Sequence, residues 1–232
     1  MRDYCQTYRV NTETNKTAAD QPTPRSRLHR LPERGSYEVA SALAIVEQVG
    51  HGTVAYQGDQ GLRILPTLLW CDPETVYIHG SSASRAIRDL ADGRECCLNA
   101  YTLDGVVVAR SAQHMSVNYQ SATLFGVMEV VPEDRKTPEL AALVNRMTPG
   151  RWDEIRKPSP AEDKSVTVLQ LAITDCSVKV RTGPPVDDEA DYDLPIWAGV
   201  VPMSRMAGTP IADPRLSNDQ PAPRSLDEIH FG

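Results

Sequence analysis

Hydroxyl and arginine side chains follow a short apolar run in the segment Val76–Leu90, which reads VYIHGSSASRAIRDL. Its first three residues are typical of a strand, and its last eight have the apolar spacing of a helix. N–H groups at the start of a helix lack intrahelical partners and carry positive partial charge, so they favour an anion. Ser82 is the expected N-cap, and Arg85 and Arg88 are three residues apart, so both guanidinium groups can lie on one face. The segment predicts a phosphate site, with an ordinary capped surface helix as the alternative.

Two histidines are further candidates for chemistry. His114 is expected in a loop between strands, where an imidazole that titrates near neutrality can donate a proton. A hydrogen-bonded loop histidine is the alternative interpretation of that residue. His51 follows the first predicted helix and is expected to fix the start of a strand rather than to do chemistry.

Carboxylates and thiols give weaker signals. The run VDDEADYD at 186–193 lacks the ordered spacing and the glycine of a calcium loop, so we predict a solvated acidic loop and no metal site. Five cysteines without CxxC spacing favour a reducing compartment, and the chain has no segment typical of a signal peptide. Cys96 and Cys97 are adjacent in an apparent strand, point to opposite faces and are predicted to be packing residues. We therefore expect a cytoplasmic protein.

The overall composition excludes other classes of partner. The 232 residues carry a net charge of −7 without a block rich in lysine and arginine, which argues against a nucleic-acid partner. No apolar run approaches the roughly 20 residues that span a bilayer, so no membrane partner is expected.

The elements that must position these residues begin at Ser36. Apolar residues at 39, 42, 43 and 46 predict a helix that ends at Gly50. Strands are then predicted at 53–57, 62–70 and 75–79, joined by tight turns. Pro66 cannot donate to a sheet ladder, so the second of these strands is expected at an edge or a bulge.

The second half of the chain adds more strands and one clear helix. We predict a hairpin of 95–101 and 106–111 around Asp104-Gly105, a strand at 117–131, a helix starting at Thr137-Pro138, and a hairpin of 165–173 and 175–181. An apolar segment around Trp197 follows. Short strands with helices outside them favour a nearly closed antiparallel barrel over a doubly wound parallel sheet. Expected limits are an irregular N-terminal arm at 1–35, one domain at 36–211 and a polar tail at 212–232.

Several segments in this order resemble the FMN-binding split-barrel flavoproteins of the pyridoxamine 5′-phosphate oxidase-like family, and most of all the subgroup related to nitroimidazole-resistance proteins. The matching segments are His51-Gly52-Thr53, RILPTLLW from Arg63, YIHGSSASR from Tyr77, DGVVVARSAQHMSVNYQS from Asp104, KVRTGPPVDDE from Lys179 and WAGVVP from Trp197. The resemblance implies a mainly β fold with peripheral helices, built on a six-stranded antiparallel split β-barrel. It also implies non-covalent FMN and a homodimer whose interface forms two cofactor sites.

The resemblance further implies roles for individual residues. The flavin ring and its phosphate would be edged by Arg63, Ile64, Leu65, Pro66 and Thr67. Ile78 and His79 would lie along the flavin, and its phosphate would receive hydroxyl groups and a cation from Ser81, Ser84 and Arg85. Ser121 would add a hydroxyl from a long strand, and Trp197, from its own or the other subunit, would place an aromatic ring near the flavin.

The sequence leaves three functions open. The first is an FMN-dependent oxidoreductase that acts on an unidentified small molecule. The second is a flavin-, haem- or deazaflavin-binding protein without turnover, and the third is a barrel repurposed for cofactor-independent chemistry. Close relatives tend to have arginine where this chain has Gln120, which leaves one less cation for the phosphate and predicts reduced FMN affinity. The chain also lacks the C-terminal Arg-Leu-x-x-Arg type of segment of the authentic oxidase, so oxidation of vitamin B6 is not expected.

Overall fold

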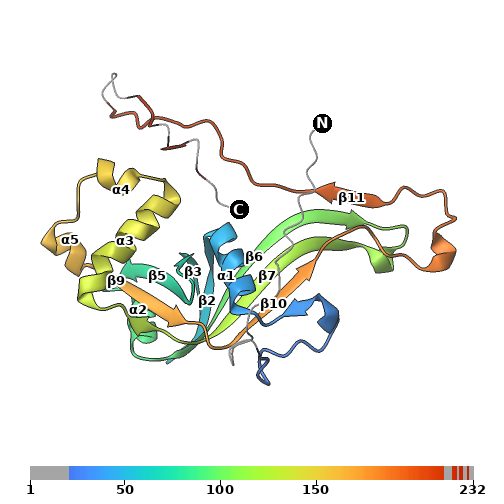
Figure 1. Ribbon diagram of the computed structural model, residues 1–232, viewed down its shortest axis with the longest axis horizontal. Coiled ribbons are helices and arrows are strands. Elements are labelled where there is room, and N and C mark those ends of the chain that lie inside the picture. Colours follow the sequence, from blue (N-terminus) through green and yellow to red (C-terminus); the bar gives the residue numbers. More distant parts are fainter. Residues whose placement is uncertain (1–20, 217–220, 224, 227–228, 230–232) are drawn as a thin grey trace.

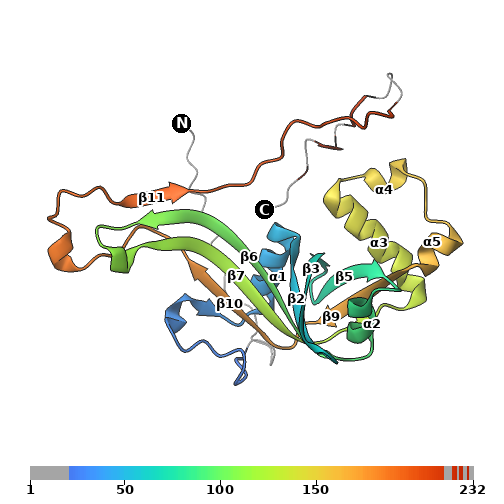
Figure 2. The same cartoon turned by 180° about the vertical axis from the view of Figure 1, so that it is seen from behind.

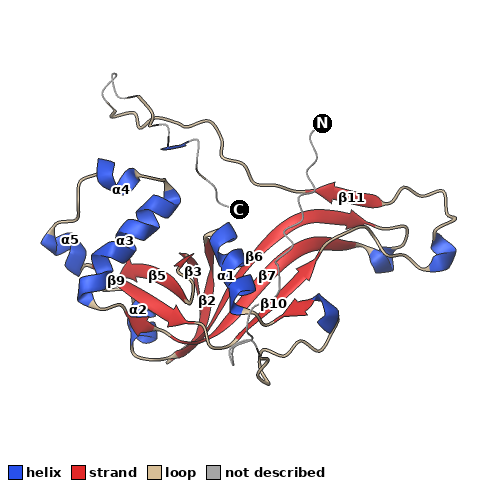
Figure 3. Cartoon of the chain, in the orientation of Figure 1, coloured by secondary structure: helices blue, strands red, loops and turns tan. Residues whose placement is uncertain are grey.

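The strands form two antiparallel sheets in the computed structural model, which describes residues 21–216, 221–223, 225–226 and 229 (Figure 3). The larger sheet contains β1 (Gly35–Ser36), β2 (His51–Gly58), β3 (Gly61–Leu68), β6 (Glu95–Val108), β7 (Ser116–Val127), β10 (Cys176–Arg181) and β11 (Gly199–Pro202). The smaller sheet contains β4 (Trp70–Cys71), β5 (Thr75–Ser81), β8 (Glu129–Val130) and β9 (Val166–Ala172). The predicted mainly β, antiparallel architecture is confirmed, although the described residues form eleven strands rather than six.

The described residues also form five α-helices, which lie outside the sheets (Figure 1). They are α1 (Val39–Val49), α2 (Arg85–Ala91), α3 (Glu133–Met147), α4 (Arg151–Glu154) and α5 (Pro160–Lys164). As predicted, α1 ends at Gly50, whose left-handed backbone (φ 67°) lets its N–H donate to Val46 O at 2.9 Å. The helix then passes directly into β2.

Two apolar clusters hold the elements together. In the main core, the buried face of α1, which includes Ala42 and Val46, packs with residues of both sheets such as Leu98 and Ile78. The second cluster lies on the other face of the smaller sheet, where Trp70 stacks on Tyr77 beside Leu143 of α3. Both sheets therefore share one core, and α3 covers the outer face of the smaller sheet.

The strands β6, β7, β10 and β11 extend beyond the core as an arm (Figures 1 and 2). The first half of β6 pairs with β2, and its second half pairs along the same edge with β11. Because β6 is continuous from Glu95 to Val108, the hairpin predicted around Asp104-Gly105 is wrong. A register shift between Leu103 and Gly105 absorbs these turn residues as a bulge within the strand.

The predicted hairpin of 165–173 and 175–181 is also wrong, because β9 pairs with β5 and β8 in the smaller sheet whereas β10 pairs with β1 and β7 in the larger one. The remaining local corrections concern helix starts. Ser84, not Ser82, is the N-cap of α2, and α3 begins at Glu133 with Pro138 inside it rather than at Thr137. The Ser82 hydroxyl instead lies 2.9 Å from Thr167 Oγ1 and donates to Lys164 O. Tertiary contacts to β9 and α5 thus take the serine that the sequence pattern assigned to the cap.

The described part of the predicted N-terminal arm, residues 21–35, packs on the domain. Arg25 Nε lies 2.6 Å from Asp175 Oδ2, and Thr23 donates to the same oxygen at 2.9 Å. Gly35 and Ser36 then pair with β10. The first 20 residues of that arm, and most of the last 16 residues of the predicted tail, lie outside the described residues.

Candidate functional site

Two arginines from separate elements converge on one amide. Arg63 Nη2 of β3 donates to Gln60 Oε1 at 3.2 Å, and Arg85 Nη1 of α2 donates to the same oxygen at 3.4 Å. Both hydrogen bonds are exposed to solvent. The structure therefore brings together the two arginines that the sequence proposed for phosphate binding, and adds Gln60, which the sequence analysis did not single out.

The local sequence explains this convergence. The turn between β2 and β3 ends at Gly61, whose φ of +107° is accessible mainly to glycine, and this turn presents Gln60 beside the first residues of β3. The helix α2 is fixed because Ile87 and Leu90 are buried in the main core. Arg85, the first residue of that helix, consequently projects toward the turn.

Nearby carboxylates are occupied by other groups. Arg94 Nη2 lies 2.5 Å from Asp59 Oδ1, and Arg94 Nε lies 3.7 Å from Asp89 Oδ1. The hydroxyl of Tyr56 donates to Asp89 Oδ2 at 3.2 Å. Within the described part of the chain, neither Arg63 nor Arg85 forms an ion pair, so their charge is available to an external anion.

An apolar row lies on the face of the larger sheet opposite to that of Arg63, whose paired neighbours are Tyr56 and Cys96. Ile64 of β3 pairs with Ala55, which pairs with Cys97, which in turn pairs with Phe125. Directly paired residues point to the same face, so these four side chains form a row across four strands. Ile64 is 70% exposed. Such a row can support a flat aromatic ring.

Alternation along β3 divides the predicted stretch Arg63–Thr67 between two faces. Ile64 and Pro66 are exposed on the face of the apolar row, whereas Leu65 packs against the main core from the opposite face. Thr67 donates to Leu68 O at 3.3 Å. As predicted, Pro66 lies on an edge strand, because β3 is the last strand of its sheet.

The two predicted flavin-binding residues of β5, Ile78 and His79, point to opposite faces of the smaller sheet. Ile78 has no exposed surface and belongs to the main core, so its side chain cannot line a cofactor in this structure. His79 points to the other face, toward Trp70, with their ring centroids 6.0 Å apart. Its Nδ1 is buried without a hydrogen-bond partner among the described residues, and burial lowers the pKa of the imidazole.

The two predicted phosphate serines shape the turn before α2. Ser81 is exposed at the end of β5, and its hydroxyl accepts a hydrogen bond from Ala83 N at 3.2 Å. Ser84 N donates to Ser81 O at 2.8 Å, and the Ser84 side chain makes no cap hydrogen bond. Both serines therefore lie next to Arg85, although α2 spans only Arg85–Ala91.

Three predicted site residues lie elsewhere in the same chain. Ser121 of β7 donates to Lys179 O at 3.3 Å and is three strands away from β3. His114 follows β6 at the tip of the arm, where its Nε2 lies 3.4 Å from Asp188 Oδ1. Trp197 precedes β11 and is 67% exposed.

The register shows how far the arm tip is from the arginines. Arg63 pairs with Tyr56, which pairs with Cys96, so the arginines lie level with Cys96 on β6. From Cys96 to Val107 the strand advances by about 35 Å, at roughly 3.3 Å per residue. His114 and Trp197 therefore cannot contact a small ligand held by Arg63 and Arg85 of the same chain.

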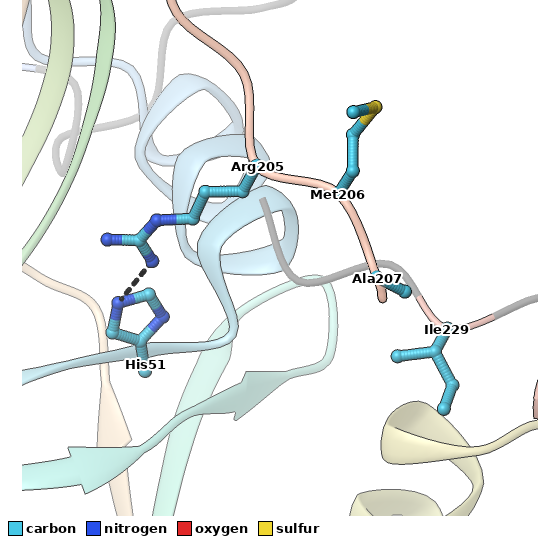
Figure 4. Close-up of a pocket in the computed structure, with 5 residues that line it drawn as sticks. All are labelled: His51, Arg205, Met206, Ala207 and Ile229. Atoms are coloured by element: carbon cyan, nitrogen blue, oxygen red, sulfur yellow. Dashed lines mark hydrogen bonds between the residues drawn. The ribbon is translucent and has the colours of Figure 1, made fainter. Parts of the chain in front are cut away.

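A second candidate site lies at the start of β2. His51 and residues of the C-terminal segment line an open cavity of about 360 Å³ (Figure 4). His51 Nδ1 lies 2.8 Å from Val49 O, and its Nε2 lies 3.1 Å from Arg205 Nη1. The first contact links the His51 ring to the last residue of α1 at the start of β2, whereas the second could not be predicted from the local sequence.

Another cavity, of about 220 Å³, lies between α3, α5 and β9. Its lysine, Lys136, is already bound by Asp163 through the backbone carbonyl and through Oδ2 at 3.2 Å. Cys71, Cys96 and Cys97 are free thiols, and burial raises the pKa of Cys71 to about 12 and that of Cys96 to about 11. These thiols are poor nucleophiles.

The described residues contain no cluster of His, Cys, Asp and Glu that could hold a metal ion. Among the described helices, none has the length and apolar character needed to span a membrane.

Comparison with known families identifies the chain. Residues 38–180, more than half of the sequence, match the family model described as pyridoxamine 5′-phosphate oxidase. The chain belongs to this family. The family resemblance predicted from the sequence is therefore confirmed.

Solved structures support the same assignment. The flavocytochrome Anf3 from Azotobacter vinelandii is 34% identical, with a TM-score of 0.86 over 92% of this chain and 100% of the other. The FAD and heme binding protein from Mycobacterium smegmatis is also 34% identical, with a TM-score of 0.81 over 85% of this chain and 97% of the other. No protein with a curated function matches the sequence.

A more distant structure shares only the fold with this pyridoxamine 5′-phosphate oxidase family member. It is a Bacteroides thetaiotaomicron protein provisionally described as a 5-nitroimidazole antibiotic resistance protein. It is 18% identical, with a TM-score of 0.50 over 60% of this chain and 81% of the other. The split-barrel fold predicted from the sequence is confirmed by these similarities.

Proposed function

We propose that this chain is a flavin-dependent oxidoreductase that acts on an unidentified small molecule. The observation that carries the proposal is the convergence of Arg63 and Arg85 on Gln60 without a carboxylate partner among the described residues. Paired guanidinium groups that share only a neutral acceptor suit a phosphate, which flavin nucleotides carry and which each arginine can bind through charge-assisted hydrogen bonds.

The surroundings of the arginines fit the rest of a flavin. Ile64 and Pro66 are exposed on the face of β3 opposite to Arg63 and offer a surface for a flat ring that reaches around this edge strand, while the turn at Ser81 offers hydroxyl groups. When bound, the flavin supplies hydride or electron transfer. The residues of this chain hold the phosphate, orient the ring and exclude water from one of its faces. FMN is the flavin proposed from the sequence, and FAD is the flavin named for the Mycobacterium smegmatis relative.

We also propose that the active form is a homodimer. Tyr101 (65% exposed) and Leu103 lie on the same sheet face as Ile64, so the apolar surface continues along the arm. A second copy would cover this surface. In a two-fold arrangement, His114 and Trp197 at the arm tip, and Ser121 along the arm, can serve the flavin of the partner subunit. His114 would then act as the proton donor.

Haem is proposed as a second cofactor. The support comes from the two relatives that are 34% identical, since one is described as a flavocytochrome and the other as binding FAD and haem. A histidine with one ring nitrogen facing a cavity is present in this chain at His51. We also propose a cytoplasmic location, which the free thiols of Cys71, Cys96 and Cys97 support.

Visible spectroscopy of the purified protein tests the proposal. The protein should bind FMN or FAD with their oxidised flavin spectrum, and hemin with a Soret band. Anaerobic addition of NADH or NADPH should then bleach the flavin, and air should restore it. A flavin that stays oxidised with either donor would support a binding protein without turnover, whereas the absence of flavin binding would refute the proposed function.

A further inference from the structure

We propose that His51 would hold the iron of a bound haem through its Nε2 atom, and that Arg205, which lines the same cavity, would bind a haem propionate. The inference rests on the haem binding proposed above and names the residues that hold the group. It concerns only the start of β2 and the C-terminal segment, which lie apart from the Arg63–Arg85 phosphate site.

The hydrogen bonds of His51 determine its tautomer. A carbonyl oxygen only accepts, so the contact to Val49 O requires a proton on Nδ1. A guanidinium only donates, so the contact to Arg205 requires a lone pair on Nε2. Both contacts select the tautomer with the proton on Nδ1, and the Nε2 electron pair that accepts from Arg205 becomes available to iron when this guanidinium moves away. This is the arrangement of metal-binding histidines, whose second nitrogen donates to a carbonyl or carboxylate.

The backbone around His51 is rigid. The preceding residue, Gly50, is the left-handed end of α1 and accepts a hydrogen bond from Leu69 N at 2.9 Å. The following residue, Gly52, lies so close to β6 that a Cβ atom there would be 2.4 Å from Asn99 O. His51 itself pairs with Leu68 in β3. A ligand held from both sides in this way has its orientation fixed before iron binds.

The cavity has the composition expected around a haem edge. Met206, Ala207 and Ile229 supply an apolar wall, and Arg205 supplies the one cation (Figure 4). Arg205 belongs to an exposed segment without regular structure, so its guanidinium can leave Nε2 without disturbing a helix or strand. A propionate is a carboxylate, with which a guanidinium forms strong paired hydrogen bonds.

The other described histidines lack this combination. His29 is exposed, and His114 lies beside Asp188 at the arm tip. His79 has an unpartnered buried Nδ1, but its ring packs beside Trp70 and lines neither cavity described above. The fifth histidine, His230, lies outside the described residues.

Hemin titration of matched variants tests the assignment. His51→Asn keeps an N–H group that can donate to Val49 O and removes the Nε2 electron pair, and His29→Ala is the control. We expect wild-type protein and His29→Ala to bind one hemin per chain with the same Soret band. His51→Asn should bind hemin at least ten-fold more weakly, and its ferrous form should lose the iron–histidine stretch in resonance Raman spectra.

A separate binding measurement tests the role of Arg205. Arg205→Ala should weaken hemin binding several-fold while leaving the iron–histidine stretch in place. Hemin dimethyl ester, whose propionates carry no charge, should bind Arg205→Ala and wild-type protein equally. Equal weakening of both ligands by Arg205→Ala would overturn the propionate assignment.

The remaining outcomes separate this inference from the proposed function. Circular dichroism shows whether each variant is folded, and adding imidazole to a folded His51→Gly variant provides a second test, because it should restore the wild-type Soret position. If folded His51→Asn keeps the wild-type spectrum and Raman stretch, His51 is not the ligand although haem binding stands. If wild-type protein binds no hemin, both haem proposals are overturned.

Discussion

Arg63 and Arg85 donate to the same oxygen atom, Gln60 Oε1, from a strand and a helix that are not adjacent in the sequence. Like charges at such close quarters repel each other, and a neutral amide oxygen offsets only part of this repulsion. An anion bound between them would relieve it. Because the packing of α2 on the core positions Arg85 beside Arg63, this packing should also affect the affinity for a phosphorylated ligand.

Arg85→Ala should weaken FMN binding by about ten- to one hundred-fold, because it removes a charge-assisted hydrogen bond worth roughly 1.5–3 kcal/mol. Riboflavin lacks the phosphate and should bind the variant and the wild-type protein equally. Isothermal titration with both ligands provides the measurement. Arg88→Ala is the matched control and should have a smaller effect, since Arg88 lies one turn further along α2. Unchanged FMN affinity, or an equal loss of riboflavin, would place the phosphate elsewhere.

Gln60→Glu should also lower FMN affinity by ten-fold or more while leaving both arginines in place. The new carboxylate would pair with Arg63 and Arg85 and compete with the phosphate for them. Raising the salt concentration should narrow the difference from wild type, because the competing ion pairs are exposed. An affinity in Gln60→Glu equal to that of wild type would show that the convergence on Gln60 has no role in binding.

Ile64→Asp should shift the protein from dimer to monomer. The substitution places a charge at the β3 end of the apolar row, where a dimer would bury it without a partner. Analytical ultracentrifugation at micromolar concentration measures the change, and Glu33→Ala, at an exposed turn before β1, is the control. A wild-type protein that sediments as a monomer with flavin bound would contradict the homodimer.

Asp175→Asn should lower the free energy of unfolding at neutral pH by about 1–3 kcal/mol, since it weakens the contacts with Arg25 and Thr23. Burial raises the pKa of Asp175, but hydrogen bonds from Ser26, Arg25 and Thr23 outweigh it and lower the pKa. With the native pKa below the unfolded value of about 3.9, the unfolded state binds the proton first. The stabilisation is therefore complete above about pH 4 and is lost as the pH falls through the native pKa. Denaturant titrations between neutral and acidic pH should show the two proteins converging, and parallel curves would contradict this.

His79→Leu should flatten the pH dependence of stability on the acidic side of neutrality. Burial lowers the native pKa of His79 below its unfolded value of about 6.5, so the unfolded state binds the proton more readily in that window. In the wild-type protein this destabilises the fold as the pH falls from about 7 toward about 5. Urea denaturation of the cofactor-free protein at several pH values measures the slope. An equal slope in His79→Leu would show that His79 is not the titrating group.

Short sequence patterns correctly predicted the elements whose structure depends on residues close together in the sequence. The helix before Gly50 and the edge position of Pro66 follow from apolar spacing and from the missing N–H of proline, and both are confirmed. The turn signal at Asp104-Gly105 failed because β6 is paired on both sides there, with β7 and β11. Strand pairing over that length outweighs a preference for a two-residue turn, and the chain accommodates it as a bulge.

The candidate site was predictable only where its residues are close in sequence. Ser81, Ser84 and Arg85 come from one turn, and the structure keeps them together. The cavity beside His51 depends on Arg205, which is 154 residues away and follows no sequence periodicity. Pairings between a strand and an irregular segment at such separation leave no pattern in a single sequence.

The edge position of β3 also bears on how this protein avoids aggregation. An unpaired edge strand with exposed apolar side chains, here Leu62 and Ile64, is a template for adding strands from other molecules. Proteins commonly block such edges with proline and with charge, and β3 carries both, in Pro66 and Arg63. Replacing Pro66 by valine would lengthen a continuous β-forming edge and favour sheet growth between molecules during storage. We therefore expect the proline that interrupts this strand to limit strand addition between molecules.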